Sequence, residues 1–370
     1  MMKIIEKETK IICSNPTNPH HAYFAWPSVA RLQDGRLAMV ASGFRNQHIC
    51  PFGKVVMCVS DDEGKTWTRP MIVMDTPLDD RDAGILPFGE NSVLITSFNN
   101  RIEWQRGVNH KDLETAKRWG NQRSQSPYVE GYLDIVDAEK AEEQFLGSTF
   151  IMSHDGGKTF GEVKRVPVSA PHGPTLMRDG SILYVGRACT PLAEKEGDGI
   201  EAYKIYPDGS FEKLGEIENV SEGLYSCEPH AIVLESGKII VHIRVQNMGY
   251  FTIFQSESYD DGKTFTKPHQ LLEKRGGAPA HLLQLKDGTL VSSYGYRTAP
   301  FGIKFMFSQD EGETWDVGHD IHVLEDEENS DLGYPASVEL QNGDILTVYY
   351  TRENMSSPSV IMQTIWKFER

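Results

Sequence analysis

The sequence is poor in cysteine, and its few cysteines are not paired. Five cysteines are spread over 370 residues, and no two of them form a CxxC motif. An odd number of widely spaced cysteines does not build a disulfide framework and is typical of reduced thiols inside a cell. The sequence therefore predicts free cysteines and a cytoplasmic protein.

Long apolar segments are also missing. No run of about 18 apolar residues occurs, so we expect no transmembrane helix. The first 13 residues, MMKIIEKETKIIC, scatter charges among the apolar positions. That pattern lacks the continuous apolar core of a signal peptide, which agrees with the cytoplasmic prediction.

Positive charge is the third deficit. The chain has 37 Lys and Arg against 53 Asp and Glu, a formal net charge of −16. Phosphate backbones and anionic lipid surfaces bind basic surfaces, so this balance argues against nucleic acid and membrane as partners. The total charge does not fix the local field inside a cleft.

Two short sequence motifs, or phrases, recur along the chain, and the first predicts a β-hairpin. Alternating apolar residues lead into a turn such as DG, SG or NG and continue in a second apolar strand. Alternation on both sides of such a turn is a strong hairpin signal. The turn residues of the six copies, of which the second is weaker, are Gly35, Ser92, Gly180, Gly237, Gly288 and Gly343.

The second phrase is an acidic box, S-x-D-x-G-x-T-[W/F], which follows a predicted third strand. Its four copies begin at Ser60, Ser153, Ser258 and Ser308. Each unit then has four antiparallel strands, with the box between the third and the fourth. A four-stranded repeat of about 50 residues is typical of a β-propeller. The sequence predicts an all-β fold, a six-bladed β-propeller of four-stranded antiparallel blades.

The predicted propeller is one domain over residues 1–370. The last unit ends on a third strand, and the N-terminal KIIEKETKIIC is expected to supply the fourth and close the ring. A long interval in blade 2 marks an insertion at about 99–147, between its second and third strands. The insertion is expected to form a lid or to reach a neighbouring subunit, which leaves a homo-oligomer open. Its candidate pocket residues are Arg101, Trp104, Arg106, Trp119 and Tyr128, although a solvated loop explains them equally well.

Strand order separates the two ends of each blade. Both kinds of turn lie at one end, so the first strand starts and the second strand ends at the other, around the mouth of the central channel. Ligand sites favour such mouths. Each polar residue there has an ordinary structural explanation, but the convergence of different polar residues at equivalent positions favours a binding pocket. These residues are Trp26, Arg81, Asp82, His172, Glu228, His230, His281 and Tyr334, with Arg45, Arg187, Arg244, Arg297 and Arg352 at the ends of second strands.

The acidic box resembles the Asp-box, or BNR repeat, of the sialidase-like (neuraminidase superfamily) propellers. In that superfamily the box is a structural turn, in which Asp and Ser side chains bind turn amides and the Trp or Phe packs between strands. A calcium loop would need several oxygen ligands converging on one point, and boxes in different blades do not provide that. The resemblance therefore implies a scaffold role for the boxes.

The resemblance also extends to single positions. SCEPHAIVLESGKIIVHIR is similar to the sialidase segment with a Glu in the first strand and an Arg ending the second, which match Glu228 and Arg244. LGYPASVELQNGDILTVYY places Tyr334 at the position of the sialidase nucleophile. The resemblance implies a retaining exo-glycosidase of carbohydrate metabolism, acting on a glycan or oligosaccharide with an acidic sugar. Tyr334 would attack the anomeric carbon and Glu228 would take its proton.

Three departures from the sialidase pattern stand beside these matches. In sialidases an FRIP stretch in blade 1 carries one of three arginines that bind the substrate carboxylate; it reads FAWP here, and we expect Arg45 to substitute. The third of these arginines normally precedes strand 3 of blade 5, where this chain reads PFGIKF, with only Arg297 near it. The blade-1 loop that should hold the acid Asp reads RNQHICPFGK, so Asp82 is the expected general acid, with His48 and His172 as alternatives. A ketoaldonic or uronic acid fits these departures at least as well as sialic acid.

The residues thus predict catalysis by Tyr334, Glu228 and Asp82. The predicted substrate-binding residues are Trp26, Arg45, Arg81, His172, His230, Arg244, His281 and Arg297. No metal or other cofactor is expected.

Two other classes of function stay open. A uronic-acid lyase would abstract a proton next to a carboxylate, with Mn²⁺ or Zn²⁺ held by His172, His230 and His281 as one form of it. Hydrogen bonding of these histidines to sugar hydroxyls is the favoured interpretation. A non-catalytic glycan-binding propeller is the third class, and the pairing of Glu228 with Tyr334 argues against it.

Overall fold

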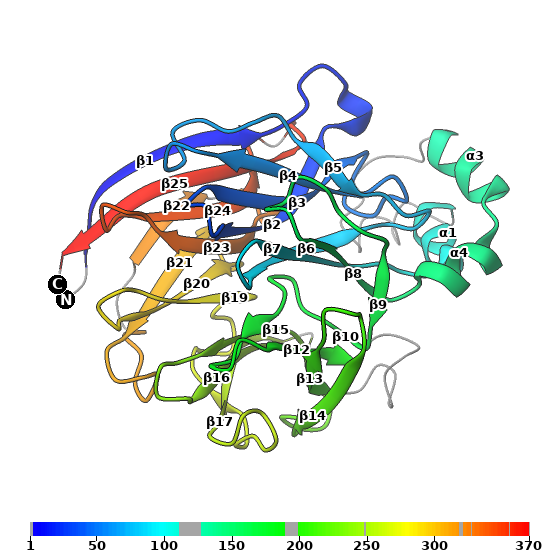
Figure 1. Cartoon of the computed structure of the whole chain (residues 1–370). Helices are drawn as coiled ribbons and strands as arrows, with labels where there is room; N and C mark the ends of the chain where they lie inside the picture. Colours follow the sequence, from blue (N-terminus) through cyan, green and yellow to red (C-terminus); the bar gives the residue numbers. More distant parts are fainter. Residues whose placement is uncertain are drawn as a thin grey trace.

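The molecule is a ring of six antiparallel sheets, seen in a computed structural model that describes residues 3–110, 127–188, 199–247, 249–317, 321–326, 328–354 and 356–369 (Figure 1). Blade 1 contains β2 (Tyr23–Arg31), β3 (Leu37–Arg45), β4 (Lys54–Ser60) and β5 (Met71–Met74), preceded by the short helix η1 (Pro19–His21). Blade 2 contains β6 (Arg81–Phe88), β7 (Ser92–Phe98), β8 (Ser148–Ser153) and β9 (Lys164–Val166). Blade 3 contains β10 (Val168–Ser169), β12 (Ile182–Ala188), β13 (Ile200–Ile205) and β14 (Phe211–Ile217), with β11 (Thr175–Leu176) also paired to β12.

The remaining blades follow the same order. Blade 4 contains β15 (Tyr225–Val233), β16 (Ile239–Asn247), β17 (Tyr250–Ser258) and β18 (His269–Gln270). Blade 5 contains β19 (Ala280–Gln284), β20 (Leu290–Tyr296), β21 (Phe301–Ser308) and β22 (Ile321–Asp326). Blade 6 contains β23 (Gly333–Glu339), β24 (Ile345–Arg352), β25 (Ser359–Glu369) and β1 (Lys3–Cys13). The prediction of a six-bladed propeller with four-stranded blades is confirmed, whereas the domain limits of 1–370 stay a prediction.

The N-terminal strand closes the ring. β1 pairs antiparallel with β25, and the Thr9 and Thr364 hydroxyls lie 2.8 Å apart at facing positions of this pair. The two ends of the chain therefore lie side by side in Figure 1. Because the last blade takes its outer strand from the start of the chain, the ring is held shut by a backbone ladder, as predicted.

The hairpin turns lie where the DG, SG and NG phrases predict them. Gly35, for example, has a φ of +91°, which a glycine adopts without steric cost. Blade 2 differs slightly, because its turn passes through Gly89 (φ +57°) and Ser92 already begins β7. The second unit is therefore shifted relative to the predicted alignment.

The apolar core lies between the blades. The inner strands of the sheets are buried between neighbouring blades, as in the cluster of Leu37, Met39, Leu346 and Ile361 between blades 1 and 6, whereas outer strands such as β5 and β14 are largely exposed. Each blade thus buries its apolar faces on two other blades, which is how a repeat protein of this length keeps many small cores. The described cysteines, Cys13, Cys50, Cys58 and Cys227, are buried and free, and Cys189 lies outside the described residues.

The acidic boxes are turns with one shared bonding pattern. In blade 1 the Ser60 hydroxyl accepts the Gly64 N–H at 2.9 Å, and the Asp62 carboxylate accepts the Thr66 N–H at 2.8 Å. The same pair of bonds recurs at distances of 2.9–3.0 Å in the boxes that begin at Ser153, Ser258 and Ser308. The prediction of a scaffold role is confirmed, since the carboxylates bind the turn itself.

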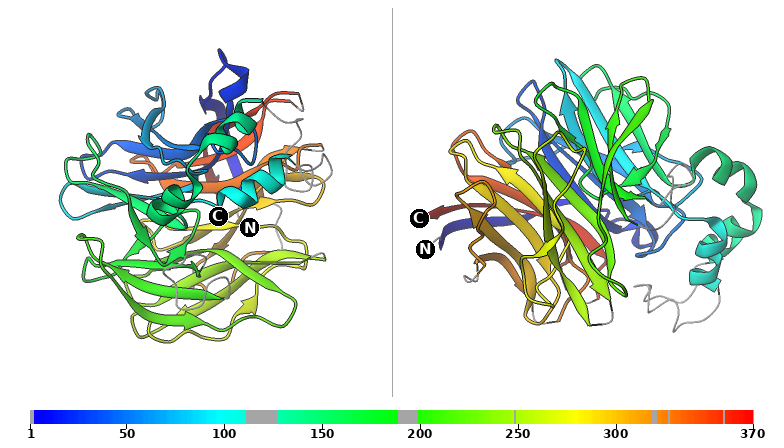
Figure 2. Two further views of the ribbon diagram at one scale, coloured as in Figure 1. Left: turned by 90° about the vertical axis from the view of Figure 1, so that its right-hand side faces the viewer. Right: turned by 90° about the horizontal axis from the view of Figure 1, so that it is seen from below.

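The insertion of blade 2 contains three described helices between β7 and β8. They are α1 (Ile102–His110), α3 (Pro127–Ile135) and α4 (Ala138–Phe145). Ile102, Leu133 and Ala141 pack there with Cys50 and Leu78 from loops of the ring. Figures 1 and 2 show these helices projecting from one side of the propeller. Residues 111–126, with Trp119, lie outside the described part. None of the described helices is long and apolar enough to cross a membrane.

Candidate functional site

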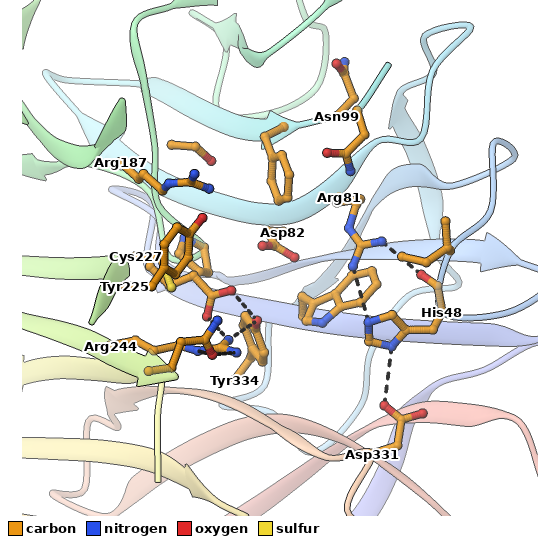
Figure 3. A pocket seen from close by; sticks show the side chains of 18 of the residues that line it. His48, Arg81, Asp82, Asn99, Arg187, Tyr225, Cys227, Arg244, Asp331 and Tyr334 are labelled. Carbon is orange, nitrogen blue, oxygen red and sulfur yellow. Dashed lines mark hydrogen bonds and ion pairs between the residues drawn. The ribbon is translucent and has the colours of Figure 1, made fainter. Parts of the chain in front are cut away.

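A cavity of about 790 Å³ opens at the mouth end of the ring, opposite the acidic boxes (Figure 3). Seven of the predicted site residues line it, namely Trp26, Arg81, Asp82, Glu228, Arg244, Arg297 and Tyr334. Four others do not, namely Arg45, His172, His230 and His281. Residues from blades 1, 2, 4, 5 and 6 thus meet at this cavity, as their positions at the strand ends predict.

A bulge repeated in four blades positions the key side chains. In each first strand the pairing skips two residues, between Ala25 and Ser28, Arg81 and Gly84, Cys227 and His230, and Gly333 and Ala336. The first skipped residue has a left-handed backbone, with φ of +54° at Trp26, +46° at Asp82, +46° at Glu228 and +50° at Tyr334.

The left-handed backbone costs roughly 1–2 kcal/mol at a residue other than glycine. Such strain gathers at functional sites, where the surrounding structure compensates for it. Four strained residues that all line one cavity therefore mark this rim as the candidate active site.

Tyr334 and Glu228 form the centre of the site. The Tyr334 hydroxyl donates to Glu228 Oε1 at 2.8 Å, and Arg244 donates to Glu228 Oε2 at 2.5 Å and to the tyrosine oxygen at 3.3 Å. Burial and the neighbouring Glu228 charge raise the pKa of Tyr334 well above its usual value, although Arg244 opposes them. The phenol is therefore neutral at rest, and its proton already points at the carboxylate that can take it.

Two arginines flank this pair. The Arg244 guanidinium lies 4.7 Å from the Phe251 ring centre, and Arg297 lies 5.7 Å from the same ring and 5.8 Å from the Tyr334 ring. Arg297 is fixed by a bond of 3.0 Å to the Leu332 carbonyl. Both cations thus lie beside the tyrosine, where a guanidinium can bind an anionic group.

Asp82 is the second carboxyl group with a distinctive environment. It is 5% exposed, and its Oδ1 atom has no hydrogen-bond partner among the described residues. Burial raises the pKa of Asp82 to about 7; the Arg81 charge lowers it and the Glu228 charge adds to the rise. A carboxyl that keeps its proton up to neutral pH and faces a cavity is suited to general-acid chemistry.

A chain of polar contacts holds Arg81 in the wall beside Asp82. Arg81 Nη2 donates to His48 Nε2 at 3.4 Å, since a guanidinium has no acceptor, and its guanidinium lies 4.2 Å from the Trp26 ring centre. His48 Nδ1 in turn lies 3.6 Å from an Asp331 oxygen. Burial lowers the pKa of His48 despite Asp331, so the imidazole is neutral and accepts from Arg81.

Arg45, expected to replace the missing blade-1 arginine, lies beneath the site. Its side chain has no exposed surface and pairs with Asp79 at 2.6 Å. It also donates to the His48 carbonyl at 2.8 Å and lies 4.8 Å from the Trp26 ring centre. In this geometry Arg45 supports the loop that contains His48. Of the two arginines Arg45 and Arg81, only Arg81 lines the cavity.

The three channel histidines pack against one another below the cavity. The His230 and His281 rings stack with centres 4.5 Å apart, and His172 meets them edge-on at 5.6 and 5.1 Å. Burial lowers the pKa of all three, so the imidazoles are neutral. His230 Nδ1 accepts the Leu282 N–H at 2.9 Å, which leaves its proton on Nε2. Within the described ranges no group of three His, Cys, Asp or Glu side chains is arranged to hold a metal ion. Whether a metal ion or no cofactor is used stays a prediction.

Several lining residues escaped the sequence analysis. They are His48 (named only as an alternative acid), Asn99, Asn100, Tyr225, Cys227, Gln246 and Asp331, with Arg187 named only as a strand end. Tyr225 and Cys227 begin the same strand as Glu228, so the strand-end criterion applied over three more residues would have found them. Burial raises the pKa of Cys227 to about 12, so its thiol is no competing nucleophile.

The insertion contributes one of its candidate residues to the cavity. Trp104 of α1 lines it, beside Asn99 and Asn100 at the start of the insertion. Arg101 instead pairs with Glu142 at 3.1 Å, Arg106 donates to the Leu133 carbonyl, and Tyr128 is exposed on α3. Trp119 lies outside the described residues.

Solved structures with the same fold include proteins of known and unknown activity. A protein of unknown function from Dyadobacter fermentans has 20% sequence identity and a TM-score of 0.75, with coverage of 100% of this chain and 99% of its own. The intramolecular trans-sialidase of Ruminococcus gnavus has 13% identity and a TM-score of 0.67, with 96% of each chain covered. The NanB sialidase of Streptococcus pneumoniae has 13% identity and a TM-score of 0.65, with coverage of 96% of this chain and 70% of its own. At these identities the likeness is one of fold.

A search among curated proteins gives no match. The sequence pattern described as a BNR repeat-like domain, in contrast, matches residues 133–347. That range is more than half of the chain and carries the boxes that begin at Ser153, Ser258 and Ser308. The protein therefore belongs to the family of BNR repeat-like domains.

Proposed function

We propose that the protein is a retaining glycoside hydrolase that cleaves the glycosidic bond of an acidic sugar. The observation that carries this proposal is the 2.8 Å hydrogen bond from the Tyr334 hydroxyl to Glu228, inside a cavity lined by arginines. A buried phenol with a pKa well above its usual value is a weak nucleophile, and an adjacent carboxylate is the group that activates it.

The first step forms a glycosyl–tyrosine bond. Tyr334 Oη attacks the anomeric carbon while Glu228 takes the phenolic proton. Asp82 donates its proton to the glycosidic oxygen as the bond to the leaving group breaks. The pKa of about 7 gives Asp82 the protonated state that this role needs at neutral pH.

The second step releases the sugar. A water molecule gives a proton to the Asp82 carboxylate and attacks the anomeric carbon, the bond to Tyr334 breaks, and Glu228 returns the proton to the phenol. Asp82 is then protonated again and ready for the next cycle. Atoms and charges balance over the two steps without a metal ion or a redox partner.

The arginines favour an acidic sugar as the substrate. Arg244 and Arg297 both lie beside Tyr334, where a carboxylate on the attacked sugar would be bound. A neutral phenol approaches such an anionic sugar without the charge repulsion that an Asp or Glu nucleophile would meet. Two of the structural neighbours, a sialidase and a trans-sialidase, are consistent with an acidic sugar. A ketoaldonic or uronic acid fits the missing blade-1 arginine as well as sialic acid does.

The decisive experiment is a screen of the purified protein against aryl glycosides and oligosaccharides of acidic sugars, sialosides included. A hydrolase releases a reducing sugar, whereas a lyase gives an unsaturated uronate that absorbs in the ultraviolet. A fluorinated substrate analogue should then trap the intermediate as a mass increase on the peptide that contains Tyr334. Release of an unsaturated product, or an adduct on another residue, would contradict the proposed mechanism.

A further inference from the structure

The side of the cavity beyond Asp82 is not used by the proposed chemistry. Asp82 must stand next to the glycosidic oxygen, so the leaving group extends past it, away from Tyr334. In Figure 3 Arg187 lies on the far side of Asp82 from Tyr334. The leaving group therefore points away from Tyr334, towards the cavity wall formed by blades 2, 3 and 4.

That wall presents an aromatic side chain. The Arg187 guanidinium lies 4.4 Å from the Tyr225 ring centre, and Tyr225 is still 38% exposed. An aromatic ring fixed on one side by a cation and open to a cavity is a platform on which a flat apolar surface can stack. The C–H face of a pyranose ring is such a surface.

Tyr225 borders two hollows. Tyr225 also lines a second hollow of about 420 Å³, together with Asn219, Ser221, Glu222 and Ser226. These hydroxyl, amide and carboxylate groups are the hydrogen-bonding partners that sugar hydroxyls need. The main cavity of about 790 Å³ is itself in the range that holds ligands of several rings. The two spaces together exceed what a single sugar needs.

We propose that Tyr225, supported by Arg187, forms a subsite for the leaving sugar, so that the natural substrate is an oligosaccharide rather than a simple glycoside. This inference rests on the proposed function, because the direction from Tyr334 to Asp82 sets which side the leaving sugar takes. The leaving sugar stacks on Tyr225, and the next one along the chain reaches the hollow of Asn219 and Ser221.

The test compares two substrates that share the same acidic sugar. One is the oligosaccharide cleaved in the screen, and the other is the glycosyl fluoride, whose leaving group fills no subsite. Tyr225→Ala should lower kcat/KM for the oligosaccharide roughly tenfold to a hundredfold, the size of one lost stacking contact, and change that for the fluoride less than about twofold. Tyr225→Phe keeps the ring and should restore most of the loss.

Tyr259→Ala is the matched control. Tyr259 is 68% exposed and belongs to the acidic box of the same blade, at the opposite end from the cavity. Tyr259→Ala should have the wild-type kcat/KM for both substrates. Equal losses of Tyr225→Ala on both substrates, or no loss on either, would overturn the subsite.

A binding measurement separates this inference from the proposed function. Tyr334→Phe keeps the cavity but lacks the nucleophile, so titration calorimetry with 3′-sialyllactose and tetragalacturonic acid measures binding without cleavage. Weaker binding by the double variant Tyr334→Phe, Tyr225→Ala than by Tyr334→Phe alone supports the subsite, even if the wild-type protein hydrolyses nothing. Binding that is absent with both probes, or unaffected by Tyr225→Ala, refutes it.

Discussion

The two ends of each blade repeat in different ways. At the acidic-box end the same residues make the same bonds in four blades, such as Ser60 with Gly64 and Ser308 with Gly312. At the mouth end the backbone repeats instead, as a bulge with a left-handed residue, while the side chain at that residue changes from blade to blade. Where both the residues and their bonds repeat, the repeat is a scaffold. Where only the backbone repeats and the side chains vary, the repeat forms the candidate site.

The boxes also connect neighbouring blades. Trp67 Nε1 donates to the Gln363 side chain at 2.7 Å, and Trp315 Nε1 donates to the Gln255 side chain at the same distance. Each Gln returns a bond to the carbonyl of the box glycine, Gly64 or Gly312, at 2.9 Å. The box end therefore holds the ring together, which lets the mouth end carry strain.

The largest effect is expected from Tyr334, the proposed nucleophile. Tyr334→Phe removes only the hydroxyl and should lower kcat roughly a thousandfold or more, as for other nucleophiles, with an unchanged melting temperature. Tyr349→Phe is the control, because Tyr349 is equally buried but bonds to Thr364 away from the cavity. Initial rates and thermal melts of both variants check this, and near-normal turnover by Tyr334→Phe would remove it as nucleophile.

The pH dependence should reveal Asp82. Its pKa of about 7 means that the general acid is protonated below pH 7 and loses its proton above it, so kcat/KM for an oligosaccharide should fall about tenfold per pH unit on the alkaline side. Asp82→Asn should lower the plateau and remove this limb, while the glycosyl fluoride, which needs no acid, is cleaved at a similar rate. A limb that persists in Asp82→Asn would assign the acid to another group.

A smaller effect is expected from His48, which holds Arg81 in the cavity wall. His48→Phe keeps a ring under Arg81 but loses the nitrogen that accepts from it, so KM should rise about tenfold with little change in kcat. His48→Gln offers an oxygen acceptor and should restore part of the loss. An equal fall in kcat with KM unchanged would instead give His48 a direct part in the chemistry.

The smallest effect on activity is expected at the box end. Asp310→Ala removes the acceptor of the Thr314 N–H, held at 2.9 Å, and should cost about 2 kcal/mol of unfolding free energy with a melting point lower by a few degrees. Its kcat/KM at a temperature well below melting should equal that of the wild type. A change in substrate preference would blur the division between the two ends.

Much of the fold follows from local signals in the sequence. The hairpin turns, the boxes and the missing last strand each depend on a few neighbouring residues, because a turn residue and period-2 alternation specify a strand pair locally. The closure of the ring by residues 3–13 was predictable for the same reason, since one unfilled position and one spare strand were both visible.

The candidate site was predictable only in part. The ends of strands gave Glu228, Tyr334, Arg244 and Asp82, since position in the repeat alone brings them to the mouth. Asp331 was missed because it lies in a loop, where no repeat fixes its place, and its role depends on Tyr23, His48 and Arg352 from other parts of the chain. Loop residues meet only through the closed ring.

The sequence by itself determined the number of blades, their order and the end at which the candidate site lies, because these follow from short-range hairpin patterns repeated six times. Only the tertiary structure decided which of Arg45 and Arg81 reaches the cavity. Arg45 and Arg81 are both near the mouth in sequence, but Asp79 binds Arg45 below the surface, and His48 and Trp26 hold Arg81 in the wall. Arg81 Nη1 lies 3.5 Å from the same Asp79 carboxylate, against 2.6 Å for Arg45. Such distances, and the burial that makes the carboxylate bind one cation more closely, are not encoded in the spacing of residues along the chain.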